Sequence, residues 1–190
     1  MVTAPTAIID ACVLYSAPIR DLVVRLAQAG LLQARWSDEI HEEWMRNLLK
    51  NNPRVSRERL GRTRFLMDAA IRDSLVTGHS QLVDSLTLPD PDDRHVLAAA
   101  IHSGAGLIVT FNLMDFPLES VAPHGVEACH PDELFSKLLD AASDEFCAAA
   151  RLQRLALKNP PMTVEAFLSK LEEVGLPRTA ARLRSTADRL

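Results

Sequence analysis

The chain has 190 residues and a formal net charge of −4, and its composition of 47% hydrophobic and 24% charged residues is typical of one globular domain with a small addition. No apolar run reaches the length of a membrane span, and the first residues lack the basic and apolar regions of a secretion signal. The three cysteines show no Cys-x-x-Cys spacing, so neither a disulfide framework nor a zinc site is expected. We therefore expect a cytoplasmic protein with no membrane partner.

The first predicted strand covers residues 6–11 and carries Asp10 near its carboxyl end. A helix is predicted from about residue 16 to Ala29, and Gly30 is expected to stop it. In open α/β sheets functional groups gather where strands end and helices begin, which makes Asp10 a candidate site residue. The same carboxylate could instead cap the next helix or bind nearby backbone amides.

A second strand is predicted over residues 31–35, and Ser37 is expected to cap the helix that follows. On that helix Glu43 shares a face with the apolar residues, so its carboxylate is predicted to point inward. Its neighbour Glu42 is expected to pair outward with Arg46, four residues later. Of these two adjacent glutamates, Glu43 is the candidate site residue.

Positive charge gathers between Arg46 and Arg64, and Ser56 is expected to cap a basic helix reaching about residue 75. A second basic cluster lies near the C-terminus, at Arg178, Arg182, Arg184 and Arg189. Most charge runs are solvated helix faces, but such clusters can also contact phosphate. The candidates for phosphate contact in the first cluster are Arg46, Lys50, Arg54 and Arg57.

Three aspartates open the segment at residues 88–100, which follows a predicted extended stretch over 81–88. Asp90 is expected to cap a helix, and Asp92 favours the positive end of its dipole. Asp93 instead shares the apolar face of that helix. Capping explains why acids are tolerated here, but only a site explains why Asp93 points inward. His95 is expected to point away from Asp93 and to have a structural or surface role.

Two further strands are predicted, over residues 107–110 and 126–130. Asn112 and Asp115 lie just beyond the end of the first of them, and Asp132 is expected to cap a helix after the second. Strands that alternate with helices favour an α/β domain with a mostly parallel sheet. We predict this domain over residues 1–142 and a helical C-terminal extension over residues 143–190.

Four carboxylates can therefore meet at one edge of the sheet, from Asp10, Glu43, Asp93 and Asp115. Clustered carboxylates repel one another, so such a group needs a compensating cation. Carboxylate oxygens suit Mg²⁺ or Mn²⁺ and not zinc. A metal held in this way can orient a phosphodiester and activate water, which is the chemistry of a nuclease.

Four motifs in this order resemble those of PIN domains, above all the VapC-type toxin ribonucleases of bacterial toxin–antitoxin modules. The motifs are Ile8-Ile-Asp10, Ser37-x-x-Ile-x-x-Glu43, Asp90-x-Asp-Asp93-Arg-His-Val-Leu-Ala-Ala-Ala and Ile108-Val-Thr-Phe-Asn-Leu-Met-Asp115-Phe-Pro. The resemblance covers about residues 6–135. It implies a three-layer α/β/α fold, RNA cleavage that depends on Mg²⁺ or Mn²⁺, and inhibition by a cognate antitoxin.

The resemblance also implies roles for particular residues. Asp10, Glu43 and Asp93 match the acidic core of the family as metal ligands and catalytic residues. Many PIN domains have an aspartate where this chain has Asn112, so we assign the fourth acid to Asp115, with Asn112 beside it. Thr110 matches a small hydroxyl residue, which we assign a supporting role together with Asp90. The four basic residues from Arg46 to Arg57 become candidates for binding RNA such as tRNA or another structured RNA.

Two other functions remain open from the sequence. A PIN domain could be kept as a non-catalytic RNA-binding or regulatory module, or it could be a structure-specific nuclease directed at DNA. The C-terminal extension could pack on the domain, form a homodimer or antitoxin surface, or help to grip RNA.

Overall fold

The computed structural model describes residues 4–158 and 160–190 of the chain. In these residues five strands form one sheet in the order β3-β2-β1-β4-β5, and every neighbouring pair is parallel. The strands are β1 (Thr6–Ile9), β2 (Gln33–Ser37), β3 (Leu75–Val76), β4 (Leu107–Val109) and β5 (Glu127–Cys129). The predicted parallel α/β sheet is confirmed.

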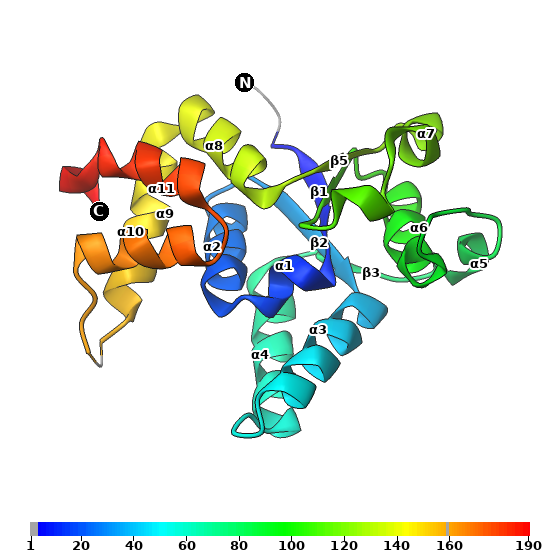
Figure 1. Ribbon diagram of the computed structural model, residues 1–190, viewed down its shortest axis with the longest axis horizontal. Coiled ribbons are helices and arrows are strands. Elements are labelled where there is room, and N and C mark those ends of the chain that lie inside the picture. Colours follow the sequence, from blue (N-terminus) through cyan, green and yellow to red (C-terminus); the bar gives the residue numbers. More distant parts are fainter. Residues whose placement is uncertain (1–3, 159) are drawn as a thin grey trace.

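Helices cover both faces of this sheet (Figure 1). On one side α6 (Arg94–Ser103) packs against β1 to β4, with α5 (Ser80–Val83) and α7 (Leu118–Val121) nearby. On the other side lie α2 (Ala17–Gln28) and α8 (Pro131–Ala141). Short 3-10 turns complete the domain and the C-terminus: η1 (Pro91–Asp93), η2 (Leu113–Asp115), η3 (Ala122–His124) and η4 (Ala187–Arg189). The three-layer α/β/α fold is confirmed.

The strands at the centre of the sheet are apolar because both of their faces are covered. Ile8 and Ile9 of β1 and Ile108 and Val109 of β4 have no exposed surface. Trp36 on β2 is also fully buried in this core. None of the helices in the described part of the chain is long and apolar enough to cross a membrane.

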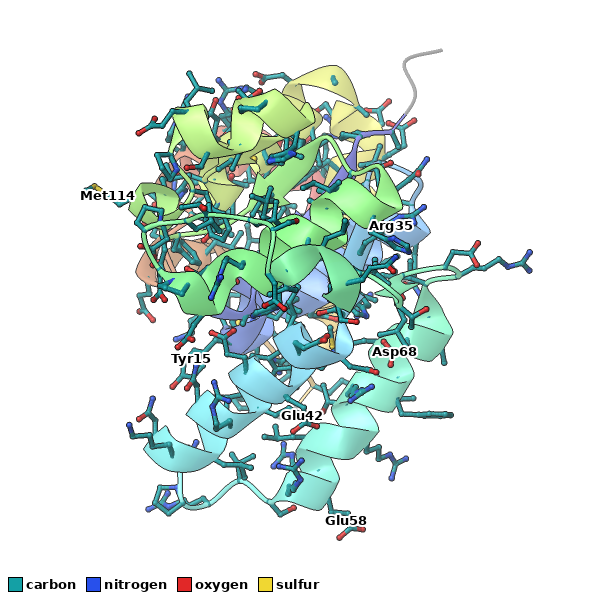
Figure 2. The ribbon with its side chains drawn as sticks, turned by 90° about the vertical axis from the view of Figure 1, so that its right-hand side faces the viewer. Tyr15, Arg35, Glu42, Glu58, Asp68 and Met114 are labelled. Carbon is teal, nitrogen blue, oxygen red and sulfur yellow. The ribbon has the colours of Figure 1, made fainter. Side chains whose placement is uncertain are left out.

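The helices α3 (Asp38–Asn51) and α4 (Arg57–Ala70) form a hairpin that extends away from the sheet, with Glu58 near its far end (Figure 2). Both helices begin at the predicted caps. Ser37 Oγ accepts a hydrogen bond from the backbone N–H of Ile40 at 3.2 Å, and Ser56 Oγ accepts one from that of Arg59 at 3.2 Å. Serine caps of this kind satisfy backbone donors that the first helical turn leaves free.

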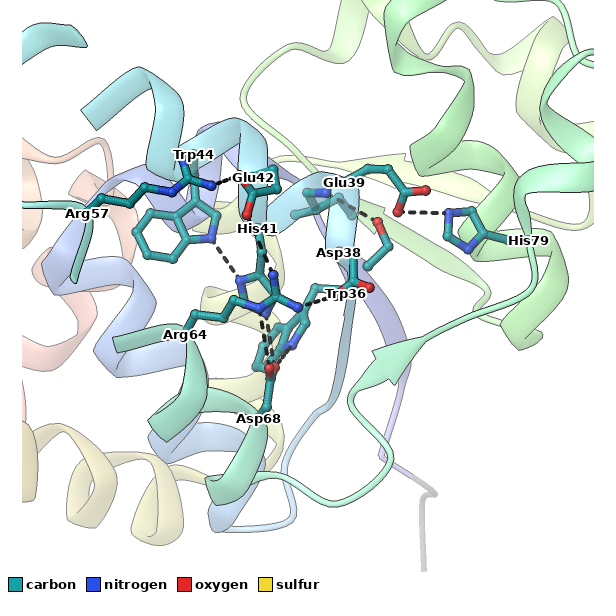
Figure 3. A network of polar contacts seen from close by, with 12 residues as sticks. Trp36, Asp38, Glu39, His41, Glu42, Trp44, Arg57, Arg64, Asp68 and His79 are labelled. Carbon is teal, nitrogen blue, oxygen red and sulfur yellow. Dashed lines mark hydrogen bonds and ion pairs between the residues drawn. The ribbon is translucent and has the colours of Figure 1, made fainter. Parts of the chain in front are cut away.

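A network of hydrogen bonds among Trp36, His41, Trp44 and Asp68 connects the hairpin to the sheet (Figure 3). Trp44 Nε1 donates to His41 Nδ1 at 3.0 Å, so the ring proton of neutral His41 lies on Nε2. His41 Nε2 and Trp36 Nε1 then both donate to Asp68 Oδ1, at 3.0 and 2.7 Å. Burial lowers the pKa of His41, which keeps the ring neutral. This network joins β2, α3 and α4.

The ion pairs of the hairpin differ from the prediction. Glu42 pairs with Arg57 at 2.7 Å and with Arg64 at 3.8 Å, so its predicted pairing with Arg46 is wrong. Arg64 also pairs with Asp38. Because α4 packs beside α3, guanidinium groups of α4 reach Glu42 from a neighbouring helix, which a spacing rule within α3 does not include.

Several predicted helices and strands begin or end at other residues in the structure. The helix expected to reach residue 75 stops at Ala70, because Asp73 has a positive φ of 59° and the chain then joins the sheet as β3. The stretch over 81–88, predicted to be extended, contains α5. The first strand ends at Ile9, where Asp10 caps α1 (Ala11–Tyr15), and the second lies over 33–37 instead of 31–35.

The C-terminal region consists of α9 (Ser143–Ala156), α10 (Val164–Glu173) and α11 (Pro177–Arg184), which pack on α2 and α8. Its helical content agrees with the prediction. The division between residues 1–142 and 143–190 stays a prediction, and α8 packs against α11 across it.

Asp132 does not cap α8 as predicted. The cap is His130, whose Nδ1 accepts from the backbone N–H of Asp132 at 3.1 Å. The Asp132 carboxylate is buried and accepts instead from the backbone N–H groups of Arg178 and Thr179, at 2.9 and 2.8 Å. It therefore caps the start of α11, because α8 and α11 lie side by side.

Candidate functional site

A cleft of about 830 Å³ opens between α3, the turn η1 and the loop after β4. Most of the side chains around it are acidic. It is lined by Asp38, Glu39, Glu42, Glu43, Arg46, Asn47, Asp90, Asp92, Asp93, His95, Asn112 and Asp115. The predicted site residues Glu43, Asp93 and Asp115 thus come together in one cleft, although they belong to three separate segments.

Asp10 lies beside this cleft and is buried, with 3% of its surface exposed. Its Oδ1 accepts from the backbone N–H of Ala11 at 2.6 Å, and its Oδ2 accepts from Thr110 Oγ1 at 2.7 Å and from Cys12 Sγ at 3.0 Å. Burial raises the pKa of Asp10, and these hydrogen bonds act against that rise. Asp10 therefore caps α1, one of the two roles considered from the sequence, and its carboxylate has a fixed orientation.

Thr110 and Cys12 join the ends of β1 and β4 around Asp10. Thr110 Oγ1 also accepts from the backbone N–H of Asn112 at 3.0 Å, and Cys12 Sγ accepts from that of Phe111 at 3.3 Å. Burial, and then the charge of Asp10, raise the pKa of Cys12 to about 12, so the thiol keeps its proton and can donate it. The sequence reasoning did not identify Cys12, because nothing local shows that it meets a strand about a hundred residues away.

Asp93 is half-buried, and its pKa is raised to about 7. Burial is the largest cause, followed by the charges of Asp10, Asp115, Asp90 and Glu43. The charges of the other three predicted acids thus all contribute to the raised pKa of Asp93. Asp90 itself is exposed and accepts from the backbone N–H of Asp92 at 2.9 Å, so the predicted cap is confirmed.

Glu43 lies on the cleft side of α3, where its Oε2 is 3.6 Å from His95 Nε2. His95 lines the cleft and is not a surface residue remote from the acids. One turn earlier on α3, Glu39 makes a similar contact with His79 at 3.5 Å. Residues 43 and 95 lie on different helices, so no local pattern in the sequence predicts this contact.

The donors in the cleft fit a divalent cation of the magnesium type. They are carboxylate oxygens together with the side-chain amide of Asn112, and burial together with the charges of the neighbouring acids raises the pKa of Asp93. In residues 4–158 and 160–190 no three His, Cys, Asp or Glu side chains stand close enough to hold an ion as they lie. Some carboxylates would therefore have to move inward to bind one.

The predicted basic residues lie along the α3–α4 hairpin beside the cleft. Arg46 lines the cleft, while Lys50 and Arg54 are exposed further along. Arg57 is paired with Glu42. In the C-terminal cluster, three arginines are paired with carboxylates: Arg182 with Asp140, Arg184 with Glu165 and Glu172, and Arg189 with Asp144.

Comparison with known proteins gives matches in both parts of the chain. A family model described as PIN domain matches residues 6–114, and one described as VapC50 C-terminal domain matches residues 131–185. A Mycobacterium tuberculosis protein described as "Putative ribonuclease VapC50" is 38% identical over 92 residues, which are 48% of this chain and 54% of that protein. The match therefore spans about half of that relative. No solved structure matches the chain.

Proposed function

This chain belongs to the PIN-domain family, and from that premise we propose that it is a metal-dependent endoribonuclease that hydrolyses phosphodiester bonds in RNA. One observation carries the proposal: Glu43, Asp93 and Asp115, from three separate segments, line one cleft at the edge of a parallel sheet, and the buried carboxylate of Asp10 lies beside it. A binding surface for RNA would gain nothing from such a cluster, because RNA is itself negatively charged. The name of the mycobacterial relative supports the same activity.

Asp10, Glu43, Asp93 and Asp115 are the residues that would hold Mg²⁺ or Mn²⁺, with Asn112 beside them. A bound cation of this kind supplies positive charge to the scissile phosphate and lowers the pKa of water. The chain's own groups orient this site. Thr110 and Cys12 hold the Asp10 carboxylate by hydrogen bonds, and His95 lies against Glu43. Asp90 supports the site by starting the turn that presents Asp93.

RNA would approach the cleft along the α3–α4 hairpin. Arg46 stands at the cleft, and neither Arg46 nor Lys50 has an ion-pair partner among the residues that the structure describes. With Arg54 they are available to phosphates, whereas Arg57 would first have to leave Glu42. Structured RNA such as tRNA is the substrate class to test.

We also propose that the chain is the toxin of a toxin–antitoxin pair, with a cognate protein antitoxin as its partner. Both matches to VapC50 support this role. The observation that would test it is a neighbouring gene for a small DNA-binding protein whose product binds this chain and stops cleavage. A homodimer remains part of this proposal, and size determination in solution would test it.

Removal of divalent metal is expected to abolish cleavage of structured RNA, and adding Mg²⁺ or Mn²⁺ after dialysis is expected to restore it. The measurement is the rate of product formation from a labelled RNA, together with Mn²⁺ binding followed by calorimetry. Asp10→Asn should lose both, because it removes the negative charge of one metal-binding group, while its remaining side-chain oxygen can still accept hydrogen bonds from Thr110 and Cys12.

Other results of the same experiment would favour the alternative functions. RNA that binds tightly without being cut, in protein that takes up no Mn²⁺, would indicate a non-catalytic RNA-binding module. Faster cleavage of branched or single-stranded DNA than of RNA would indicate a DNA-directed nuclease. Cleavage that persists unchanged in chelator would contradict the metal-dependent mechanism itself.

A further inference from the structure

The aromatic ring of Phe111 is held between the PIN domain and the C-terminal helices. On one side it meets the ring of His130 edge to face, with 4.9 Å between the ring centroids and 81° between the planes. On the other side it touches Gly175, in the turn between α10 and α11. A methyl group on Gly175 would lie 2.9 Å from Phe111 Cε1, so the turn and the ring are in close contact.

The turn that meets Phe111 is itself well fixed. Gly175 has a positive φ of 95°, and its N–H donates to the carbonyl of Glu172 at 3.0 Å. The next residue, Leu176, is fully buried, and its N–H donates to the carbonyl of Leu171 at 2.9 Å. The start of α11 is capped from the other side by Asp132. The C-terminal helices therefore present a rigid surface to the ring.

Phe111 lies in sequence between Thr110, which donates a hydrogen bond to Asp10, and Asn112, which lines the acidic cleft. Its backbone N–H donates to Cys12 Sγ, which donates to Asp10. Asp115 follows in the same loop, where its N–H donates to the carbonyl of Asn112 at 3.1 Å. A displaced ring would move the loop that carries Asn112 and Asp115.

We propose that the C-terminal helices brace the acidic site through the contact between Gly175 and Phe111, with Phe111 as a positioning residue. The contact keeps residues 110–115 against Cys12 and holds Asn112 and Asp115 at the cleft. The inference rests on the proposed function in one respect only, which is that these two residues serve a cation. It gives the C-terminal region a direct role in the geometry of the site, beyond packing on the domain.

The test uses the full chain and two measurements. The first is the Mn²⁺ affinity, and the second is the rate at which a thiol reagent modifies Cys12 in metal-free protein, with the modified peptide identified by mass spectrometry. Cys12 is partly exposed, whereas Cys129 and Cys147 are buried. Phe111→Ala should weaken Mn²⁺ binding about tenfold, as loss of a supporting contact around a metal site does, and should speed Cys12 modification. Phe111→Leu should keep most of the wild-type Mn²⁺ affinity and a Cys12 modification rate close to that of the wild type.

Two matched controls separate positioning from general loss of stability. Leu26→Ala removes a buried side chain of α2 and should lower the free energy of unfolding without changing either measurement in the folded protein. Gly175→Ala should speed Cys12 modification, while Gly30→Ala should not. Both glycines have positive φ values, but a methyl group on Gly30 meets nothing within 4 Å in the described structure.

The outcomes are distinct. Unchanged Cys12 reactivity in folded Phe111→Ala and Gly175→Ala would overturn the brace, as would equal changes in Leu26→Ala or Gly30→Ala. If the wild-type chain takes up no Mn²⁺, the proposed function fails, and the reactivity of Cys12 still decides whether Phe111 positions the loop.

Discussion

Replacing Asp93 by asparagine is expected to lower RNA cleavage on the order of a thousandfold and, at the same time, to stabilise the metal-free protein at pH 8. The activity falls because the variant loses a negatively charged donor at the centre of the acidic cluster. The stability rises because the same charge is half-buried and is also repelled by Asp10, Asp115, Asp90 and Glu43. The rate of RNA cleavage and the free energy of unfolding in urea measure the two effects.

The pH dependence of this stability follows from the raised pKa of Asp93. The folded chain holds the proton up to about pH 7, whereas the unfolded chain releases it near the usual value of 3.8. The group therefore contributes full stability below pH 3.8, and that contribution is lost as the pH rises through 7. Asp93→Asn carries no charge at this position at any pH. Its free energy of unfolding should therefore exceed that of the wild type at pH 8 by about 1 to 2 kcal/mol, a figure reduced for solvent screening of a half-buried group.

A suitable control is Asp84→Asn, which removes one exposed acid at the end of α5, away from the lining of the cleft. It should cleave RNA at the wild-type rate and show the wild-type dependence of stability on pH. The unfolding measurements are made in chelator, because a bound cation would cancel the repulsion, and the cleavage measurements are made with Mg²⁺ or Mn²⁺ present. Undiminished cleavage by folded Asp93→Asn would contradict the assignment of Asp93 to the site.

Replacing Asp68 by alanine is expected to lower the free energy of unfolding by about 2 to 4 kcal/mol. The Asp68 carboxylate is the acceptor for two donors, Trp36 Nε1 and His41 Nε2, both on residues with no exposed surface. Without it these two N–H groups lie buried and unpaired, which costs more than the loss of an exposed ion pair. Urea unfolding at pH 7.5 measures the change.

Asp68→Asn is the matched variant, because its side-chain oxygen can still accept from Trp36 and His41. It should lose much less stability than Asp68→Ala. Neither change touches the lining of the acidic cleft, so the rate of RNA cleavage by the folded protein should stay close to that of the wild type. Equal losses of stability in the two variants would show that the orphaned donors are not the cause.

Several features of the fold could be predicted because they depend on neighbours in sequence. Ser37, Ser56 and Asp90 cap helices as predicted, each by accepting from an N–H two or three residues later. Short apolar runs between helices gave the parallel sheet, since strands covered on both faces need no polar alternation. The predicted boundaries are wrong at residues 71–88, where a left-handed Asp73 and the short α5 leave little periodic signal.

The meeting of the acids could be predicted in outline for a related reason. Parallel strands place their carboxyl ends at one edge of a sheet, so Asp10 and Asp115 had to approach each other. Helical periodicity placed Glu43 on the inward face of α3, whereas Asp93 lies in the turn η1 just before α6 and reaches the cleft from there. Whether these residues bind metal and cleave RNA remains the proposal made above.

The sequence by itself determined four of the five strands, the starts of several helices and the candidate acids, because caps and periodicity act over a few residues. It did not predict β3, α1 or α5. Only the tertiary structure decided which distant groups meet. It brought Thr110 to Asp10, Cys12 to Phe111, His95 to Glu43, Asp132 to the start of α11 and Phe111 to Gly175. These contacts join segments that are close only after the sheet and its helices have packed, so no local pattern records them.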